Sequence, residues 1–323
     1  MREECSRNDS ASCPISNRLA RNRRSNDMKE RFGPLLFRTL RTLERLLPIS
    51  ALYRLLKPFA FLGAILERPQ PAVSMPGCIT GPISARSGQQ GRMRFHLNRA
   101  IEFFPDRLDS PGWKRRCGIP GFDQLQRAQR AGRGVILAFL HVGPFFLLRY
   151  WLRAYGLPVA TLVNGNAGIR SRVKRMKDRM SPFPEIPTAL YRDQLRETIA
   201  FLSAGNVLLI AIDIPTGKQV SVPTDGSWTF SMATGAIRLA ARYGAELVPC
   251  CIIDESRWRF RIEFGRPVPR EYLAEEPDLV RAGTHLLEEL LPHVRRLPEQ
   301  CQPEFIARFQ KIKPTSAPET APA

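Results

Sequence analysis

The sequence predicts an α/β fold with a mixed, largely parallel central sheet flanked by helices. Three apolar stretches, at 135–140, 158–163 and 207–212, are typical of strands that are buried on both faces. Stretches with helical spacing, at 145–155 and 195–204, lie between them along the chain. Because parallel neighbours need a crossover connection, strands that alternate with helices indicate a layered α/β sandwich.

The rest of the chain continues this alternation. Helices are expected at 92–107, 122–131, 231–243 and 279–297, and strands at 246–253 and 258–264. The last of these strands alternates between apolar and polar residues, as edge strands do. Residues 67–92 are rich in Pro, Gly and Ser and predict a linker, and the polar residues 221–228 predict a loop.

Composition indicates a large globular protein with an anionic partner. The 323 residues are 43% apolar, which is enough for a sizeable core. The formal net charge of +19 and a pI near 10.4 point to nucleic acid, an acidic membrane surface, or a phosphorylated or CoA-like substrate. The sequence has no basic-aromatic motif of the RRM, OB or helix-turn-helix kind, so no nucleic acid is expected as a partner.

The cysteines and histidines argue against a metal centre. The seven cysteines form no C-x-x-C pair, and the four histidines are scattered along the chain. We therefore expect no metal site, and reduced thiols that are mostly structural. The adjacent Cys250 and Cys251 lie in an expected strand, where a buried apolar role is favoured over chemistry.

The N-terminal region is expected to associate with a membrane. Residues 1–30 are rich in Ser, Asn and Arg and predict a disordered basic leader. Residues 31–68 predict amphipathic or membrane-anchoring helices, beginning with a basic amphipathic helix at 35–47 that suits an anionic bilayer surface. Residues 69–312 form the expected α/β domain, and residues 313–323 a disordered tail.

The apolar stretch 46–66 has the length of a membrane span but also contains charged residues. Arg54 and Lys57 lie near its middle, between Pro48 and Pro58. A cation at the bilayer centre costs roughly 2.5 to 3.5 kcal/mol on insertion scales. An interfacial or re-entrant anchor is therefore favoured over a true span, and a helix docked onto the protein's own core is the alternative.

Two titratable residues follow expected parallel strands directly. His141 comes after the strand 135–140, in the order His141, Val142, Gly143, Pro144, and Asp213 comes after the strand 207–212. Ligands of open α/β sheets bind outside the carboxyl ends of the strands, so both are candidate reactive groups that can meet. The alternatives are a core histidine with a satisfied hydrogen bond and an aspartate that caps a helix or closes a turn.

A strongly basic run lies shortly after the second expected strand. It contains six cations opposed only by Asp178: Arg170, Arg172, Lys174, Arg175, Lys177 and Arg179. Its place near the expected mouth of the sheet favours a phosphate-binding element. A solvated charged surface is the alternative.

Several blocks of sequence occur together in a recognisable order. They are Phe103-Phe104-Pro105, the stretch from Gly132 to Phe146, Asp213 with Gly217, the stretches 235–240 and 244–249, and Arg296-Leu297-Pro298-Glu299-Gln300 with Arg308-Phe309. Together they resemble the bacterial late acyltransferases of lipid A biosynthesis, the lauroyl and myristoyl transferases, within the lysophospholipid acyltransferase superfamily. The likeness covers about residues 35–312 and implies a glycerolipid acyltransferase-like fold.

The resemblance implies a reaction and a place in the cell. The family's histidine acts as general base on an acceptor hydroxyl, which attacks the thioester of an acyl carrier protein or coenzyme A. No cofactor is implied beyond this co-substrate. The implied partners are an anionic membrane surface, the carrier and a lipid acceptor, at the cytoplasmic face of the bacterial inner membrane. By the same resemblance, Arg170, Arg175 and Arg179 bind acceptor phosphate or the phosphopantetheine arm.

The resemblance breaks at the partner of the histidine. In the family, four residues separate the histidine from an acid, commonly as His-x-Gly-Asn-x-Glu. Here Gly143 is kept, but Pro144 occupies the Asn position and Phe146, after Phe145, occupies the acid position. Gly143, Phe145 and Phe146 are then expected to line an apolar substrate site. Three hypotheses follow: Asp213 replaces the acid, the acceptor is a more nucleophilic amine, or the protein is a catalytically impaired accessory factor that binds lipid or acyl chains.

Overall fold

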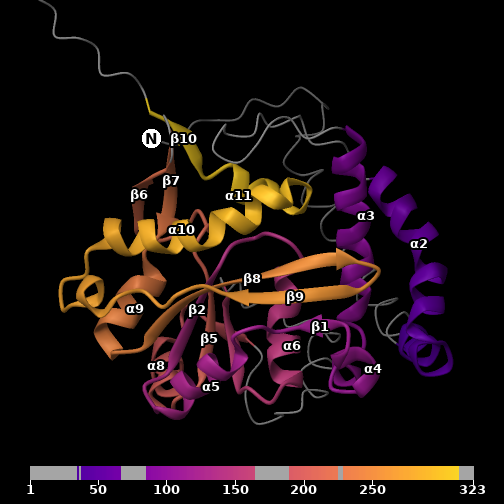
Figure 1. The fold of residues 1–323 in the computed structure, drawn as a ribbon, viewed down its shortest axis with the longest axis horizontal. Coiled ribbons are helices and arrows are strands. Elements are labelled where there is room, and N and C mark those ends of the chain that lie inside the picture. The colour runs from indigo at the N-terminus through magenta and orange to yellow at the C-terminus, as the bar shows by residue number, and fades with distance from the viewer. Residues whose placement is uncertain (1–34, 36–37, 67–84, 164–188, 225–227, 313–323) are drawn as a thin grey trace, which may run out of the picture.

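The computed structural model describes residues 35, 38–66, 85–163, 189–224 and 228–312, which form two sheets with helices around them (Figure 1). The main sheet has the strand order β1-β9-β8-β2-β5-β3-β4. These strands are β1 (Cys117–Gly118), β2 (Val135–Phe139), β3 (Val159–Val163), β4 (Ala189–Tyr191), β5 (Val207–Ala211), β8 (Glu246–Ser256) and β9 (Arg259–Phe264). Neighbouring strands are parallel except β8 and β9, which are antiparallel. The predicted mixed, largely parallel sheet is confirmed.

Helices cover both faces of this sheet, and β2 shows how the two cores are divided. Ile136 and Ala138 belong to the core that includes residues of α9 and α10, whereas Val135 and Leu137 belong to the core that includes residues of α6. Because successive strand residues point to opposite faces, a continuous apolar run is what a doubly covered strand requires. The helices of the domain are α3 (Ala85–Ile101), α4 (Pro111–Lys114), α5 (Phe122–Arg130), α6 (Leu148–Ala154), α8 (Leu195–Ser203), α9 (Gly235–Tyr243), α10 (Leu279–Arg296) and α11 (Pro303–Ile306).

A second, antiparallel sheet corrects the expected loop at 221–228. Its order is β10-β7-β6, with β6 (Gln219–Pro223), β7 (Trp228–Ala233) and β10 (Phe309–Lys311). The predicted loop was wrong at 221–223 and at Trp228, which lie in strands, while 225–227 lie outside the described residues; the helix expected from residue 231 begins at Gly235. Val222 and Phe230 are fully buried in this sheet, so tertiary packing holds a polar, alternating segment as a strand.

The linker expected at 67–92 is also corrected in part. α3 already begins at Ala85, and the helix expected at 92–107 ends at Ile101, followed by a 3-10 turn at Pro105–Arg107. Gly91 faces the backbone of Glu299, which a Cβ at this position would overlap. Gly91 therefore allows α3 to approach the segment Pro298–Gln300 closely. In the sequence alone, this glycine was one of the residues that predicted a linker.

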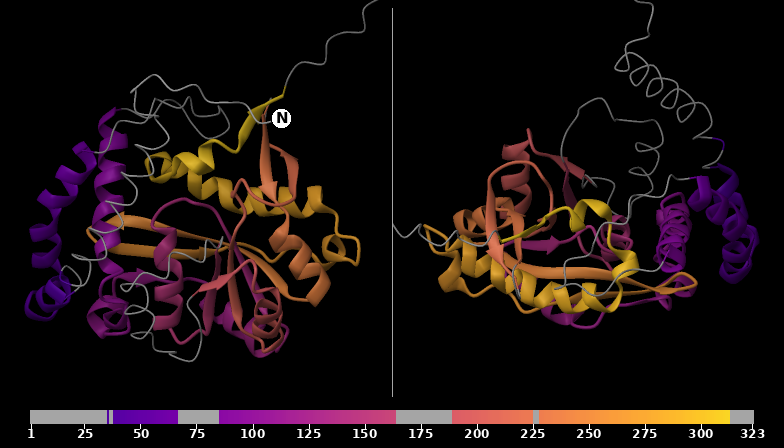
Figure 2. Two further views of the ribbon diagram at one scale, coloured as in Figure 1. Left: turned by 180° about the vertical axis from the view of Figure 1, so that it is seen from behind. Right: turned by 90° about the horizontal axis from the view of Figure 1, so that it is seen from above.

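The N-terminal helices stand at one end of the molecule, with α2 (Ile49–Leu66) outermost (Figures 1 and 2). Residues 38–46 are helical, in agreement with the expected helix at 35–47. α2 packs on α3 and the hairpin β8–β9 through Leu52, which is fully buried, and Tyr53, whose ring meets that of Trp258 edge-on at 5.4 Å.

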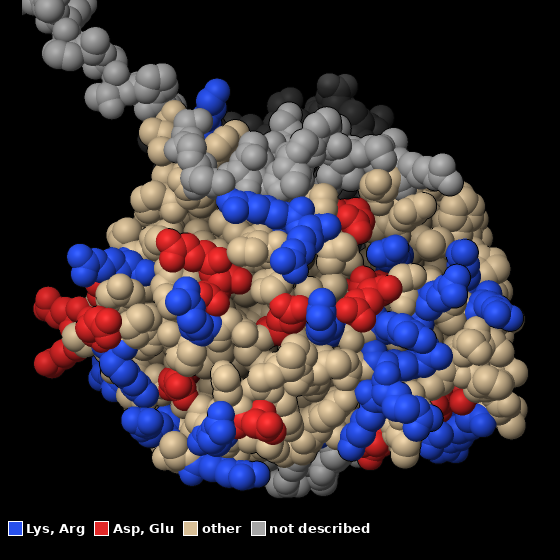
Figure 3. All heavy atoms as spheres, viewed as in Figure 1, with Lys and Arg blue, Asp and Glu red and all other residues tan. Residues whose placement is uncertain are grey.

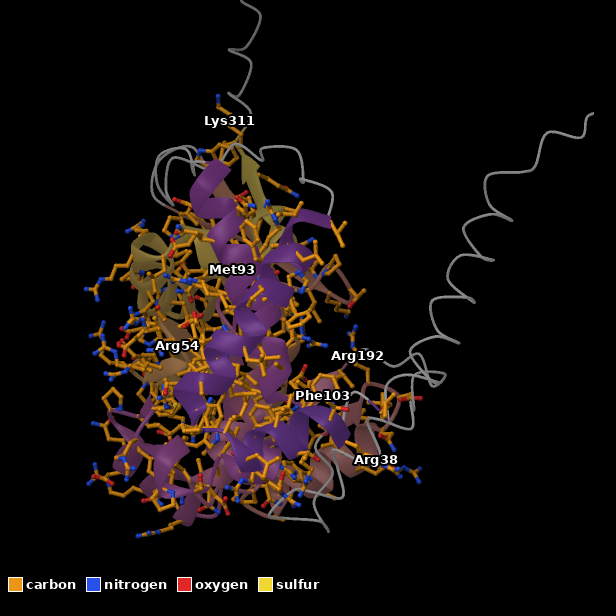
Figure 4. The ribbon with its side chains drawn as sticks, turned by 90° about the vertical axis from the view of Figure 1, so that its right-hand side faces the viewer. Arg38, Arg54, Met93, Phe103, Arg192 and Lys311 are labelled. Carbon is orange, nitrogen blue, oxygen red and sulfur yellow. The ribbon has the colours of Figure 1, made fainter. Side chains whose placement is uncertain are left out.

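The opposite side of α2 is exposed and apolar. Its exposed large residues are Leu55, Phe59, Phe61, Leu62, Ile65 and Leu66. By length and composition alone α2 is a helix that can cross a membrane, and little of it is buried. Figure 4 looks onto this end of the molecule and shows Arg54 and Arg38 at opposite edges of it. The expected leader 1–30, most of the expected linker and the expected tail 313–323 lie outside the described residues.

Candidate active site

The register between β2 and β5 brings the two predicted reactive residues together. Phe139 is paired with Ala211 in this parallel ladder, and each strand ends there. His141 and Asp213 both follow two residues later, so they leave the sheet at the same edge, at neighbouring positions. The apolar residues of both strands are buried, which fixes the ladder and, with it, the position of the pair.

The carboxylate of Asp213 holds His141 at two points. Oδ1 lies 2.7 Å from Nδ1 of the imidazole, and Oδ2 accepts a hydrogen bond of 2.7 Å from the backbone N–H of His141. Asp213 is completely buried, and a carboxylate can only accept, so Nδ1 is the protonated nitrogen. Nε2 is then the basic nitrogen of the ring.

The geometry favours the reactive alternative for each residue, and their catalytic role stays a prediction. Both carboxylate oxygens of Asp213 face His141, so the aspartate is not a helix cap. The His141 side chain is 25% exposed and lines a cavity, so it is not a buried core histidine. The arrangement is a histidine whose tautomer and orientation are fixed by a buried acid, with its other nitrogen available for proton transfer.

Phe146, at the position where the resemblance expects an acid, is packed as an aromatic residue. Its ring meets Phe95 edge-on at 5.3 Å, and the guanidinium of Arg99 lies 4.8 Å from the ring centroid. Phe145 lies between this group and the His141–Asp213 pair, since its ring contacts that of Phe146 at 5.5 Å and the imidazole of His141 at 4.4 Å. Phe145 and Phe146 both line the cavity, and their expected role in substrate binding stays a prediction.

The turn after His141 is held by the segment that follows α10. Gly143 has φ +62°, and a Cβ there would overlap the carbonyl oxygen of Ile252. Its N–H donates to the carbonyl of Gln300 at 2.9 Å, and the N–H of Gln302 donates to the carbonyl of His141 at 3.0 Å. Gly143 thus acts as a turn residue here, and a direct role for it in substrate binding stays a prediction.

The cavity in front of His141 has a volume of about 780 Å³. One set of side chains makes it apolar: Phe139, Phe145, Phe146, Leu162, Val163, Leu195, Ile199 and Leu239. A second set makes it basic: Arg149, Arg192, Lys218, Arg238 and Arg242. A space of this size and character suits a ligand with an apolar body and an anionic group.

Sequence reasoning missed the cations that line the cavity in the described residues. Arg192 follows the short strand β4 and donates from Nη1 to Oγ1 of Thr216 at 2.8 Å. Arg238, on the first turn of α9, donates from Nε to Oγ1 of Thr234 at 3.2 Å. Lys218 follows Asp213 by five residues, and this closeness to a candidate reactive acid was the signal available in the sequence.

The basic run chosen from the sequence cannot be placed in the same way. Arg170, Arg175 and Arg179 lie outside the described residues. Their expected role in binding a phosphate stays a prediction. In Figure 4, Arg192 lies on the same side of the molecule as Arg38, away from Arg54.

The fold and the site together define an α/β protein with a buried-acid–histidine pair that opens on an apolar, basic cavity. Residues 95–300, more than half of the chain, match the family described as "Bacterial lipid A biosynthesis acyltransferase". The chain therefore belongs to the lipid A biosynthesis acyltransferase family, as the resemblance of the sequence blocks predicted. A search of curated proteins found no matching sequence.

Proposed function

We propose that the chain is a membrane-associated acyltransferase. It moves a fatty acyl group from the thioester of acyl carrier protein or coenzyme A to a hydroxyl or amine of a lipid or glycolipid acceptor. The observation that carries this proposal is the 2.7 Å contact between Nδ1 of His141 and Oδ1 of Asp213, which supplies the acid that position 146 lacks. Membership of the family supports an acceptor of the lipid A class.

In the proposed reaction Nε2 of His141 takes the proton of the acceptor hydroxyl as its oxygen attacks the thioester carbonyl carbon. The tetrahedral intermediate then collapses, the carbon–sulfur bond breaks, and the leaving thiolate takes the proton back from the imidazolium. The products are an ester and a free thiol. Asp213 stabilises the imidazolium and keeps the proton on Nδ1, as a buried acid does in a hydrolase triad.

The two sets of cavity side chains suit two different parts of the substrates. The aromatic and aliphatic set, which includes Phe145 and Phe146, suits a fatty acyl chain. The cations Arg192, Lys218 and Arg238 suit phosphate, which both lipid A-type acceptors and the phosphopantetheine arm carry.

The N-terminal helices support a location at the cytoplasmic face of the bacterial inner membrane. α2 exposes large apolar residues on the side away from the domain and carries Arg54 and Lys57 in its first half. Apolar residues beside cations suit an interfacial helix on an anionic leaflet.

The test compares lipids extracted from cells that carry the wild-type chain with lipids from cells that carry His141→Ala. Mass spectrometry is expected to find an acylated lipid that the variant does not produce, because no other group in the proposed step takes the hydroxyl proton. Identical products from both strains would remove His141 from catalysis.

Phe146 favours a second candidate function, a catalytically impaired accessory protein that binds lipid or acyl chains. An aromatic residue at the acid position, packed on Phe95 and Arg99, preserves the apolar wall of the cavity without contributing a charge. Purified protein that binds acyl chains but forms no product with either carrier thioester, over a range of hydroxyl and amine acceptors, would favour this function over acyl transfer.

A further inference from the structure

A second cavity, remote from His141, lies where α4, β1, the start of β9 and the start of α2 meet. Its volume is about 480 Å³, and its lining includes three arginines, Arg115, Arg116 and Arg259, beside the backbone turn at Pro48–Ser50. Figure 3 shows basic side chains gathered on the right of the molecule, over α4, β1 and the adjoining edge of α2 in Figure 1.

The ladder between β1 and β9 forces two of these arginines together. Cys117 is paired with Phe260 in this parallel pair, so Arg116 and Arg259 come immediately before a paired position. The N–H of Phe260 donates to the carbonyl of Arg116 at 2.6 Å, which keeps the two residues adjacent. Like charges on neighbouring strands destabilise a sheet, so this arrangement is costly unless an anion lies between them.

Within the described residues, no acidic side chain neutralises the charge of this cluster. In the described part of the chain, Arg115, Arg116 and Arg259 form no ion pair, and Arg116 has only a hydrogen bond of 2.9 Å to the carbonyl of Arg257. Burial, and then the nearby charge of Arg259, lower the pKa of Arg116. The cluster thus concentrates positive charge at a concave site.

The position of the cavity favours a lipid headgroup as its ligand. It lies at the first turn of α2, the helix whose exposed side carries Leu55, Phe59 and Leu62. If those apolar side chains enter the acyl region of a bilayer, as the proposed membrane association requires, the arginines lie at headgroup level.

We propose that this arginine-lined cavity binds the phosphate of an anionic phospholipid headgroup and fixes how the protein sits on the membrane. The inference rests on the membrane association in the proposed function, but not on the acyl-transfer step. Arginine suits this ligand because its planar donors bind phosphate oxygens in pairs.

The test measures binding of the full chain to vesicles of phosphatidylcholine, with and without phosphatidylglycerol, at fixed ionic strength. The variant carries Arg115→Gln, Arg116→Gln and Arg259→Gln. Each cation at an anionic surface contributes about fivefold to binding, so the variant is expected to lose roughly 100-fold in affinity for the anionic vesicles alone. Arg127→Gln, Arg130→Gln and Arg133→Gln, which remove three exposed cations on and after α5, are the matched control and are expected to lose far less.

Other results would overturn the site. They are equal losses in the two triple variants, or an equal loss on neutral vesicles. If wild type binds inorganic phosphate and the triple variant does not, while the two bind anionic vesicles equally, the cavity is assigned to a soluble phosphate. If the triple variant does not fold, Arg115→Gln and Arg259→Gln alone are each expected to lose about fivefold. Acyl transfer to a detergent-solubilised acceptor is expected to be unchanged in these variants, so failure of this inference and failure of the proposed function are separable.

Discussion

Replacing Asp213 by asparagine is the sharpest perturbation of the proposed mechanism. The carboxylate accepts two hydrogen bonds of 2.7 Å, one from Nδ1–H and one from the backbone N–H of His141. An asparagine has one acceptor oxygen and one NH₂ donor, so it can satisfy only one of these two donors. If its oxygen faces the backbone, its NH₂ faces the ring, and the proton is driven from Nδ1 to Nε2.

The size of the effect follows from that geometry. With the proton on Nε2, the ring cannot take a proton from the acceptor, and no charge remains to stabilise the imidazolium. In a hydrolase triad the same change lowers turnover about 10⁴-fold. We expect a loss of this order in kcat for Asp213→Asn, with KM nearly unchanged because Asp213 is buried behind His141. The assay is single-turnover acyl transfer from the carrier thioester, followed by mass spectrometry of the lipid product.

Three further variants test whether the effect belongs to the His141–Asp213 pair. Asp193→Asn removes an exposed carboxylate next to Arg192 and is expected to keep near-wild-type turnover. His141→Ala should be at least as impaired as Asp213→Asn, and the double variant no worse than His141→Ala, because the two residues act as a unit. Turnover of Asp213→Asn within about tenfold of wild type, in a protein where His141→Ala is inactive, would refute the orienting role of Asp213.

Three further predictions follow from the same site and its surroundings. Gly143→Ala should lower the free energy of unfolding by at least about 1 to 3 kcal/mol in denaturant titration, because φ is +62° and a Cβ overlaps the carbonyl of Ile252; an unchanged midpoint would contradict this. Arg238→Gln should raise KM for a phosphate-bearing acceptor roughly tenfold to 100-fold and leave kcat nearly unchanged, with a phosphate-free acceptor as control. Burial raises the pKa of the Cys251 thiol to about 12, so only about 10⁻⁴ of it is thiolate at pH 8; iodoacetamide should label it in unfolded but not in folded protein, and rapid labelling of folded protein would disprove its burial.

The fold could be predicted where burial dominates the choice of residues. β2 and β5 are covered on both faces, so every position must be apolar, and their sequences show this directly. β6 could not be found in this way, because only some of its residues face a core and the rest are polar. α3 was missed at its start for a related reason, since Gly91 serves a contact with Glu299 that is distant in the sequence.

The site could be predicted in part for the same reason. His141 and Asp213 each follow an apolar strand. Because ligands bind at the carboxyl ends of parallel strands, both residues could be identified as candidates. The cavity cations Arg192 and Arg238 could not be identified, because one follows β4, the other lies in α9, and only the crossovers of the chain bring them to one space. No local pattern carries that information.

The partner of a catalytic histidine can change its place in the sequence without changing its chemistry. What the imidazole requires is a carboxylate within hydrogen-bond reach of Nδ1, and a parallel ladder offers two sources: the turn that follows the histidine, and the neighbouring strand that ends beside it. Here His141 and Asp213 are 72 positions apart in the sequence, and the register of β2 and β5 brings them together. Because β5 is followed by the acid, position 146 does not need a carboxylate, and Phe146 packs there against Phe95 and Arg99. A motif defined by spacing alone would class this chain as inactive, whereas the register of the sheet supports an intact histidine–acid pair.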